Sequence, residues 1–244
     1  MAERDITIGL KLLWGRQEAP TRGPKPGLTV DRIVAAGIGV ADERGLEAVS
    51  MRAVAKRLGV GAMSLYRYVP GKAELLDLML EAALGEQPPV DASAPWRAQF
   101  EHFAHEGMAL YLRHPWMLGI SVNRPPLGPN TIGNWDAMLQ ALSGTGLSGP
   151  DIIGAATAVG AYLRGAAQSA VEAQHGESDE EWWGARMSFW EEFFEPERFP
   201  GLTALWESGG YEAPRDDFAF GLARLLDGIE AHLARERDLP TSEA

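Results

Sequence analysis

Residues 50–69 carry the pattern that most restricts the fold, because they predict two short helices separated by a tight turn. Ser50 can cap the first helix, in which apolar residues recur at helical spacing until Gly59. A Gly-Val-Gly turn follows, and the second helix is expected over about 62–68, with Leu65 pointing inward. A support helix, a tight turn and a second helix with a free outer face are what a helix-turn-helix needs to enter the major groove. The segment therefore predicts a DNA-binding helix-turn-helix.

The flanking sequence completes a small domain over residues 29–84. Thr29 can cap a helix that runs to about Arg44, and a fourth, connecting helix begins near Lys72 with apolar residues on one face. Residues 1–28 mix charges with several prolines and glycines, a composition that disfavours helix. We therefore expect a flexible basic arm ahead of the DNA-binding domain.

The net charge of −12 argues at first against a nucleic-acid partner, but the charge is unevenly distributed. Residues 22–72 contain nine basic and four acidic side chains, whereas the chain from residue 85 onward contains ten arginines and 24 carboxylates. A basic head on an acidic body can meet phosphates at one end and repel them elsewhere. The basic, proline-rich stretch at residues 22–26 fits either an arm in the minor groove or an idle tail.

Past residue 90 the chain consists of long segments rich in alanine, leucine and glutamate, joined at prolines and glycines. No alternating strand pattern and no internal repeat stands out, so the chain is predicted to be all-α, with a larger helical domain over residues 90–240. Helices are expected over about 94–113, 115–121, 130–143, 149–175, 180–194 and 214–236.

Composition also narrows the setting of the protein. The chain has no cysteine, and no apolar run approaches the ~20 residues needed to cross a bilayer. Residues 6–14 are interrupted by glycine and lysine and lack the cleavage site of a signal peptide. A cytoplasmic protein with no membrane partner is expected.

The string from Leu58 to Leu76, LGVGAMSLYRYVPGKAELL, resembles the signature of tetracycline-repressor-like (TetR) regulators. In that signature LGV is followed by LY, then by an aromatic pair, then by a lysine that opens the next helix. Together with the capped first helix, the resemblance covers residues 29–84. Tyr68 stands where many members carry histidine, and Gly71 where serine or asparagine is common.

The resemblance implies which side chains meet DNA. Arginine can bond guanine in a bidentate fashion, while alanine and methionine can only contact a thymine methyl group, so specificity should depend on Arg52 and Arg67. Lys72 would be helped at a phosphate by the positive end of the connecting helix. The implied phosphate contacts are Tyr66, Tyr68 and Lys72, and the implied base-facing residues are Arg52, Ala62, Met63, Ser64 and Arg67.

The C-terminal region resembles, more loosely, the ligand-binding domain of the tetracycline-repressor branch. The similarity lies at residues 113–116, 146–148, 160–165 and 218–229. Ala161 stands where the tetracycline binders carry a histidine that helps to hold magnesium, so the resemblance implies neither a tetracycline–magnesium ligand nor any metal or other cofactor.

A helical bundle with several aromatic residues and few fixed charges suits a small, largely apolar effector, although the same side chains could simply fill a core. We expect the effector to lower DNA affinity by acting on the connecting helix. The candidate ligand contacts are Met108, Trp116, Trp135, Tyr162, Phe189 and Trp190, with Arg164 and Gln168 as orienting polar groups.

The helices at about 149–175 and 214–236 carry more apolar residues than one bundle face needs, which predicts a homodimer and a pseudo-palindromic DNA operator.

Two other classes of protein fit less well. An enzyme would need a nucleophile or a metal beside its carboxylates; none is evident, and His102 and His105 fit a solvated face as well as a metal pair. A nucleoid protein would be basic throughout, whereas this body is acidic. The sequence therefore predicts a ligand-responsive transcriptional repressor that is not an enzyme.

Overall fold

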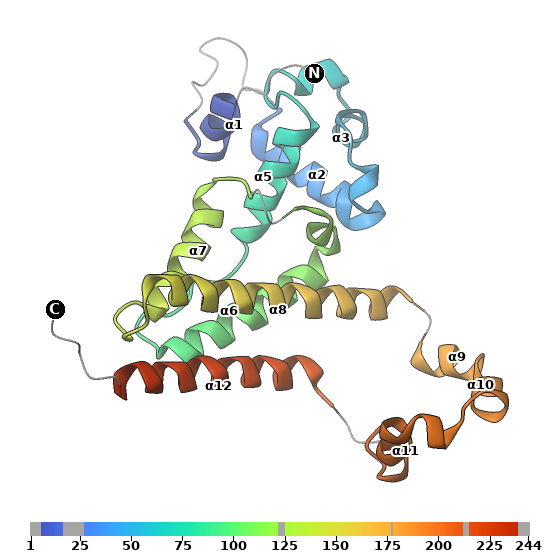
Figure 1. Ribbon diagram of the computed structural model, residues 1–244. Helices are drawn as coiled ribbons and strands as arrows, with labels where there is room; N and C mark the ends of the chain where they lie inside the picture. The colour runs from blue at the N-terminus through green and yellow to red at the C-terminus, as the bar shows by residue number, and fades with distance from the viewer. Residues whose placement is uncertain (1–5, 17–26, 122–124, 177, 212–214, 239–244) are drawn as a thin grey trace.

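The computed structural model describes residues 6–16, 27–121, 125–176, 178–211 and 215–238, and every regular element in these ranges is a helix (Figure 1). The all-α prediction is confirmed. The helix-turn-helix forms one end of the molecule, and the long helices α8 (Gly149–His175) and α12 (Asp217–Asp238) form the opposite end. A group of short helices projects beyond the ends of these two (Figure 1).

Local hydrogen bonds set the helices of the N-terminal domain, as predicted. The Thr29 side chain accepts from the backbone of Arg32, and the Ser50 side chain accepts from the backbone of Ala53. Gly45 and Gly59 follow two of these helices with φ of 78° and 69°, a left-handed region that favours glycine. The domain comprises α2 (Val30–Arg44), the 3₁₀ turn η1 (Leu46–Ala48), α3 (Met51–Leu58), α4 (Ala62–Leu65) and the connecting helix α5 (Lys72–Leu84).

The expectation of a helix-free arm is wrong for α1 (Ile6–Leu13). The prolines begin only at Pro20, and the preceding residues are apolar enough to pack on α5, with Leu12 buried. The Trp14 indole Nε1 donates to the carbonyl of Leu127 at 2.8 Å, which ties α1 to the segment before α7. The basic stretch at residues 22–26 lies outside the described residues.

The C-terminal body packs three helices against the long helix α8. Its elements are α6 (Trp96–Arg113), the 3₁₀ turn η2 (Pro115–Gly119), α7 (Pro129–Leu142), α8 and α12. Helices α6 and α8 approach closely at Gly107, where an added Cβ would lie 2.5 Å from a methyl group of Leu163. Buried side chains from all four helices, including Phe100, Leu142, Val159 and Leu226, form one core.

The region after α8 differs from prediction in two ways. The single helix expected over 180–194 is two helices, α9 (Asp179–Gly184) and α10 (Met187–Glu192). The stretch expected to lack helix contains η3 (Pro196–Arg198) and α11 (Pro200–Glu207). Both of these elements begin at a proline. Proline is favourable there because the first residue of a helix does not need its backbone N–H for a hydrogen bond within the helix.

A second core joins the DNA-binding domain to the body. It extends from Ile33 and Leu65 through α5 to Trp116 and Met117 of η2. Within the described ranges, no helix is long and apolar enough to span a membrane.

Candidate nucleic-acid interface and internal cavity

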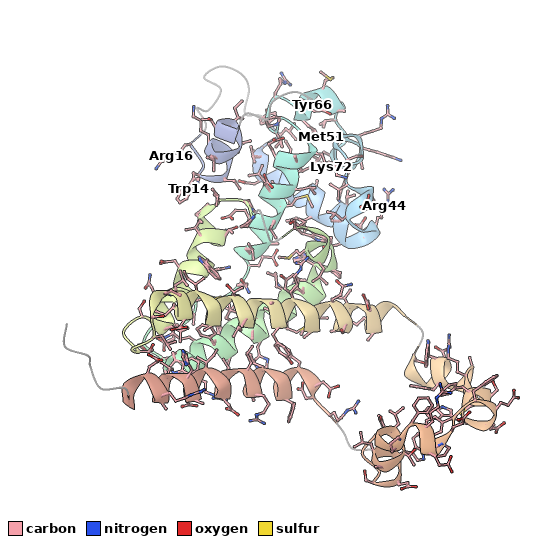
Figure 2. All side chains as sticks on the ribbon, viewed as in Figure 1. Trp14, Arg16, Arg44, Met51, Tyr66 and Lys72 are labelled. Atoms are coloured by element: carbon pink, nitrogen blue, oxygen red, sulfur yellow. The ribbon has the colours of Figure 1, made fainter. Side chains whose placement is uncertain are left out.

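The second helix of the helix-turn-helix is anchored to the core by a single buried side chain. Leu65 is fully buried, whereas Met63 is 77% exposed and Tyr66 is 45% exposed. The outer face of this helix therefore presents apolar surface to solvent. Tyr66 lies at the outer end of the molecule, away from α8 and α12 (Figure 2).

Helix α4 ends at Leu65 rather than at Tyr68 as expected. The backbone N–H groups of Tyr68 and Val69 both donate to the Leu65 carbonyl, at 2.8 and 2.9 Å, which tightens the chain into a turn. Pro70 restricts Val69 to extended backbone and prevents further helix. Tyr66 and Arg67 lie exposed on this turn, beside the half-buried Tyr68.

The basic side chains of this face are available to a partner. Arg57 is occupied, because it donates to the Glu43 carboxylate at 2.8 Å. Arg52, Arg67 and Lys72 are exposed, and within the described residues their side chains form no ion pair or hydrogen bond. Lys72 is also the first residue of α5, where unpaired backbone N–H groups favour an anion. The chemistry of the face suits phosphate and base edges together.

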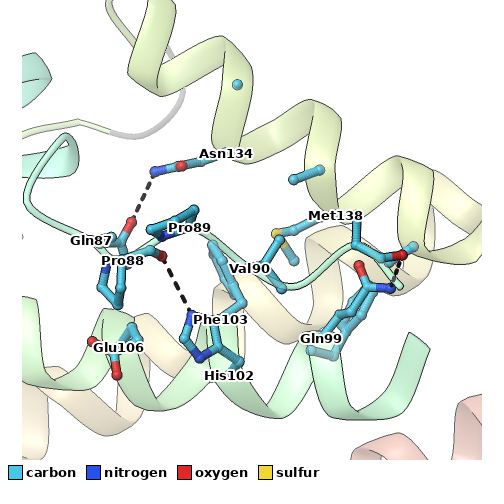
Figure 3. Close-up of a pocket in the computed structure, with 15 residues that line it drawn as sticks. Gln87, Pro88, Pro89, Val90, Gln99, His102, Phe103, Glu106, Asn134 and Met138 are labelled. Carbon is cyan, nitrogen blue, oxygen red and sulfur yellow. Dashed lines mark hydrogen bonds between the residues drawn. The ribbon is translucent and has the colours of Figure 1, made fainter. Parts of the chain in front are cut away.

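A partly open cavity lies between α6, α7 and the segment that joins α5 to α6 (Figure 3). Its volume is about 360 Å³, and most of its wall is apolar, with Phe100, Phe103 and Met138 among the lining side chains. Asn134 donates to Gln87 at 2.9 Å across one side, and a His102 ring nitrogen lies 3.4 Å from the Pro88 carbonyl. An apolar cavity with a few polar groups is typical of a small-molecule site.

The eight predicted ligand contacts do not line this cavity, and they do not converge on one site. Trp116 is buried at the domain junction, and Tyr162 stacks on Phe218 with its hydroxyl donating to backbone carbonyls of α12. The Arg164 guanidinium donates to the carbonyls of Leu118 and Ile120. The Gln168 side-chain amide donates to the Glu172 carboxylate. Met108 is half-buried on α6, and Trp135 is exposed on α7. Phe189 and Trp190 belong to α10. Whether any of them contacts a ligand stays a prediction.

Sequence reasoning missed the cavity because its wall includes a linker. In the sequence, Gln87-Pro88-Pro89-Val90 marks only a boundary between helices, although its prolines fix an extended backbone that can line a site. His102 lines the cavity and His105 contacts Phe218 instead, so the two histidines do not act as a pair. No group of three or more potential metal ligands occurs in the part of the chain that the structure describes.

A polar cluster joins the two domains beside the cavity linker. The buried His114 ring places Nδ1 2.7 Å from Asp42 of α2 and Nε2 3.2 Å from Glu86. The Trp116 indole donates to the same Asp42 oxygen at 2.7 Å. Burial opposes the charged form of Glu86, but hydrogen bonds from Arg113 and His114 outweigh it and lower the pKa of this carboxyl.

The outer face of α8 and α12 contains a shallow groove of about 370 Å³ lined in part by small side chains. Gly154 and Ala158 contribute from α8, and Gly228 contributes from α12. Large apolar side chains are exposed on the same two helices, with Ile153 at 53% and Phe220 at 66%. Arg97 of α6 ties α12 to the body through Asp227 at 2.7 Å, and this hydrogen bond is the main reason that the pKa of Asp227 is lowered.

Comparison with known proteins follows the same division of the chain. A sequence profile described as bacterial regulatory proteins of the tetR family matches residues 33–79. A second profile, described as the tetracyclin repressor-like C-terminal domain, matches residues 88–233.

Among curated relatives, the HTH-type transcriptional repressor DrrR1 of Streptomyces coeruleorubidus is 42% identical over 240 residues, which cover 96% of this chain and 88% of the relative. The class A tetracycline repressor of Escherichia coli is 26% identical over 205 residues, with 83% of this chain and 90% of the relative covered.

Solved structures show the same overall arrangement. Apo ActR from Streptomyces coelicolor superposes with a TM-score of 0.72 at 26% identity, covering 87% of this chain and 99% of that one. ActR in complex with actinorhodin gives a TM-score of 0.71 at 27% identity, covering 85% and 97%. The fold of this chain is therefore shared with a protein that has been solved both alone and in complex with actinorhodin.

Proposed function

This chain belongs to the TetR family of bacterial regulatory proteins, and from that membership we propose that it represses transcription until a small molecule releases it from DNA. It is a DNA-binding transcription factor and not an enzyme. The observation that supports the proposed site most directly is the outer face of residues 62–68, where a 77% exposed methionine lies beside unpaired basic residues. Since its target is bacterial DNA, we place its action in the cytoplasm.

Contacts to DNA divide into two kinds. Arg52 of the support helix and Arg67 of the turn after α4 are proposed to read base edges, because both side chains are exposed and direct readout needs side chains that reach into the groove. The exposed Met63 and the half-buried Ala62 and Ser64 are proposed to join them. Tyr66, Tyr68 and Lys72 are proposed to bind phosphates, which fix the register of the protein but carry no sequence information. The two kinds respond differently to substitution.

Substituting alanine for Arg67 or for Lys72 should separate these roles. We expect Arg67→Ala to weaken binding most at the preferred base and so relax specificity, whereas Lys72→Ala should weaken all duplexes alike. Loss of one phosphate contact should also flatten the dependence of log affinity on log salt by about one unit. Gel-shift titrations across salt, on duplexes selected in vitro with the wild-type protein, would measure both effects. If neither variant alters binding, these residues do not form the DNA interface.

A second copy of the chain is proposed to pack on the outer face of α8 and α12. Small side chains at Gly154, Ala158 and Gly228 let helices from a partner approach, and the exposed Ile153 and Phe220 would be buried. Such a two-fold dimer requires a pseudo-palindromic operator with half-sites about 34–36 Å apart.

Replacing Gly228 by arginine should convert the dimer to a monomer, because a long charged side chain would fill the groove and lose its water there. Size-exclusion chromatography with light scattering at micromolar concentration gives the mass directly. Ala73→Arg, an equally large change on the exposed part of α5 in the DNA-binding domain, serves as the control and should stay dimeric. A monomeric wild-type protein would refute this interface.

The effector is proposed to occupy the cavity between α6 and α7. The related ActR structure contains actinorhodin, which supports a small-molecule effector here as well. The apolar side chains Phe100, Phe103 and Met138 favour a largely apolar ligand, while Gln87 and Asn134 supply polar contacts for orientation. The ligand must bind the DNA-free arrangement more tightly than the DNA-bound one, because equal affinity would shift nothing.

A further inference from the structure

Glu81 is a buried carboxylate of the connecting helix α5, and the partners of its side chain lie on another helix. It lies on α5, is only 5% exposed, and accepts hydrogen bonds from the first turn of α7. Its oxygens accept from the backbone of Asn130, from the backbone of Thr131 at 3.1 Å and from the Thr131 hydroxyl at 2.7 Å. A buried carboxylate is costly unless it is hydrogen-bonded. All of these hydrogen bonds to the Glu81 side chain come from α7.

We propose that Glu81 is the positioning residue through which a ligand in the cavity moves the DNA-binding domain. This inference rests on the proposed ligand-responsive function and names the link that it requires. Glu81 lies on α5, whose first residue is Lys72 in the DNA-binding face, and holds α7, which forms one wall of the cavity.

The link is reciprocal and tightly fitted. The Asn130 side chain donates back to the Glu81 carbonyl at 3.0 Å, so each helix satisfies polar groups of the other. At Gly128 an added Cβ would collide with the Glu81 carboxyl group, so this approach excludes a side chain there. The negative charge also meets the positive end of the α7 dipole. Several hydrogen bonds therefore join helices α5 and α7 at this point.

The size of the cavity explains how a ligand could move α7 and, through Glu81, α5. Its volume of about 360 Å³ is near the lower end of the range of about 300–1,000 Å³ for small-molecule sites, so a larger ligand that enters between α6 and α7 would press these helices apart. Gly133, Ala137 and Met138 of α7 form the wall that such a ligand would displace, and this wall begins less than one turn after Thr131. Displacing α7 therefore displaces Glu81 and tilts α5, which changes the position of the recognition helix.

A substitution can take the place of the unidentified ligand. Ala137→Trp places a large side chain in the cavity and should force α7 outward, as a ligand would. The measured quantity is affinity for a duplex selected in vitro with the wild-type protein. In the otherwise wild-type chain we expect Ala137→Trp to reduce this affinity by about 5–150-fold, the usual span of allosteric coupling.

The same substitution is then made in the Glu81→Gln chain, which keeps the size of the side chain but removes its charge and one acceptor. We expect the effect of Ala137→Trp to shrink to less than about one third of its wild-type value. Thr131→Val, which removes only the hydroxyl donor, should give a smaller reduction in the same direction and provides a milder variant if Glu81→Gln folds poorly. Asp136→Asn removes a carboxylate from the same helix without touching α5 and should leave the effect unchanged.

The outcomes separate the two proposals. An equal loss of affinity in the wild-type, Glu81→Gln and Thr131→Val chains would overturn the role of Glu81 and leave the cavity as the effector site. No loss in the wild-type chain, with the added fluorescence of the Ala137→Trp variant showing that the introduced indole is buried, would overturn both the coupling and the proposed site. A purely stabilising role for Glu81 would lower the melting temperature without changing the ratio of affinities, so the ratio decides the question.

Discussion

Replacing Asp42 by alanine is expected to lower the free energy of unfolding by about 2–6 kcal/mol. The substitution leaves two buried donors, the Trp116 indole and the His114 ring, without their acceptor, and each buried unsatisfied donor costs about 1–3 kcal/mol. The effect is large because both donors lie in the core that joins the DNA-binding domain to the body. Urea denaturation at fixed protein concentration measures it, since dimerisation makes the apparent stability depend on concentration.

Asp42→Asn is the matched control. The amide keeps an oxygen where both donors point and removes only the charge, so the loss should be less than half of that in Asp42→Ala. A loss below about 0.5 kcal/mol in Asp42→Ala would show that water replaces the acceptor and that this junction contributes little.

The parts of the fold that could be predicted depend on interactions between neighbours in the chain. Thr29 and Ser50 each cap a helix through a backbone N–H three residues away, and Gly59 permits the left-handed turn itself. The spacing of apolar residues then places Leu65 inside and Met63 outside, as the structure has them. The residue types alone therefore predict the helix-turn-helix and which of these two side chains is exposed.

The internal site could not be predicted because distant segments create it. Trp116 is a reasonable ligand candidate by its chemistry, but its partner Asp42 lies 74 positions earlier. Glu81 and Thr131 are 50 positions apart, and nothing near Glu81 in the sequence shows that it will be buried. The cavity wall likewise depends on how the linker at residues 87–90 lies on α6 and α7. Such contacts follow from the packing of whole helices.

The aromatic residues after α8 show the same limit. The sequence predicts Trp190 as a ligand contact, but its ring lies 5.6 Å from Trp183 and 5.7 Å from Trp206, within the group of short helices. Helical spacing indicates that this segment has an apolar face, but it does not indicate which other part of the chain will pack against that face. For α1, the prediction is wrong because it treats residues 1–28 as one segment. The prolines begin only at Pro20, whereas the residues of α1 are mostly apolar.

Leu65→Ala is expected to have the largest effect on the DNA-binding domain. Leu65 is fully buried, and truncating a buried leucine costs about 2–5 kcal/mol through lost burial and the remaining cavity. Helix α4 has only four residues, so no other buried side chain within it can hold its position. Operator affinity should therefore fall together with stability, as measured by denaturation and by gel shift on the same preparations.

Met63→Ala, two residues earlier on the same helix, isolates the surface from the core. The methionine is 77% exposed, so its loss should change the free energy of unfolding by no more than about 0.5 kcal/mol. Operator affinity should nevertheless fall by about fivefold or more, because burying this side chain against DNA removes apolar surface from water. Comparable losses of stability in both variants would mean that Met63 supports the fold, and unchanged affinity in Met63→Ala would mean that this face of α4 does not meet DNA. A large loss of affinity in Met63→Ala without a loss of stability would place Met63 at the surface that DNA covers, because this side chain lines neither the core nor the cavity.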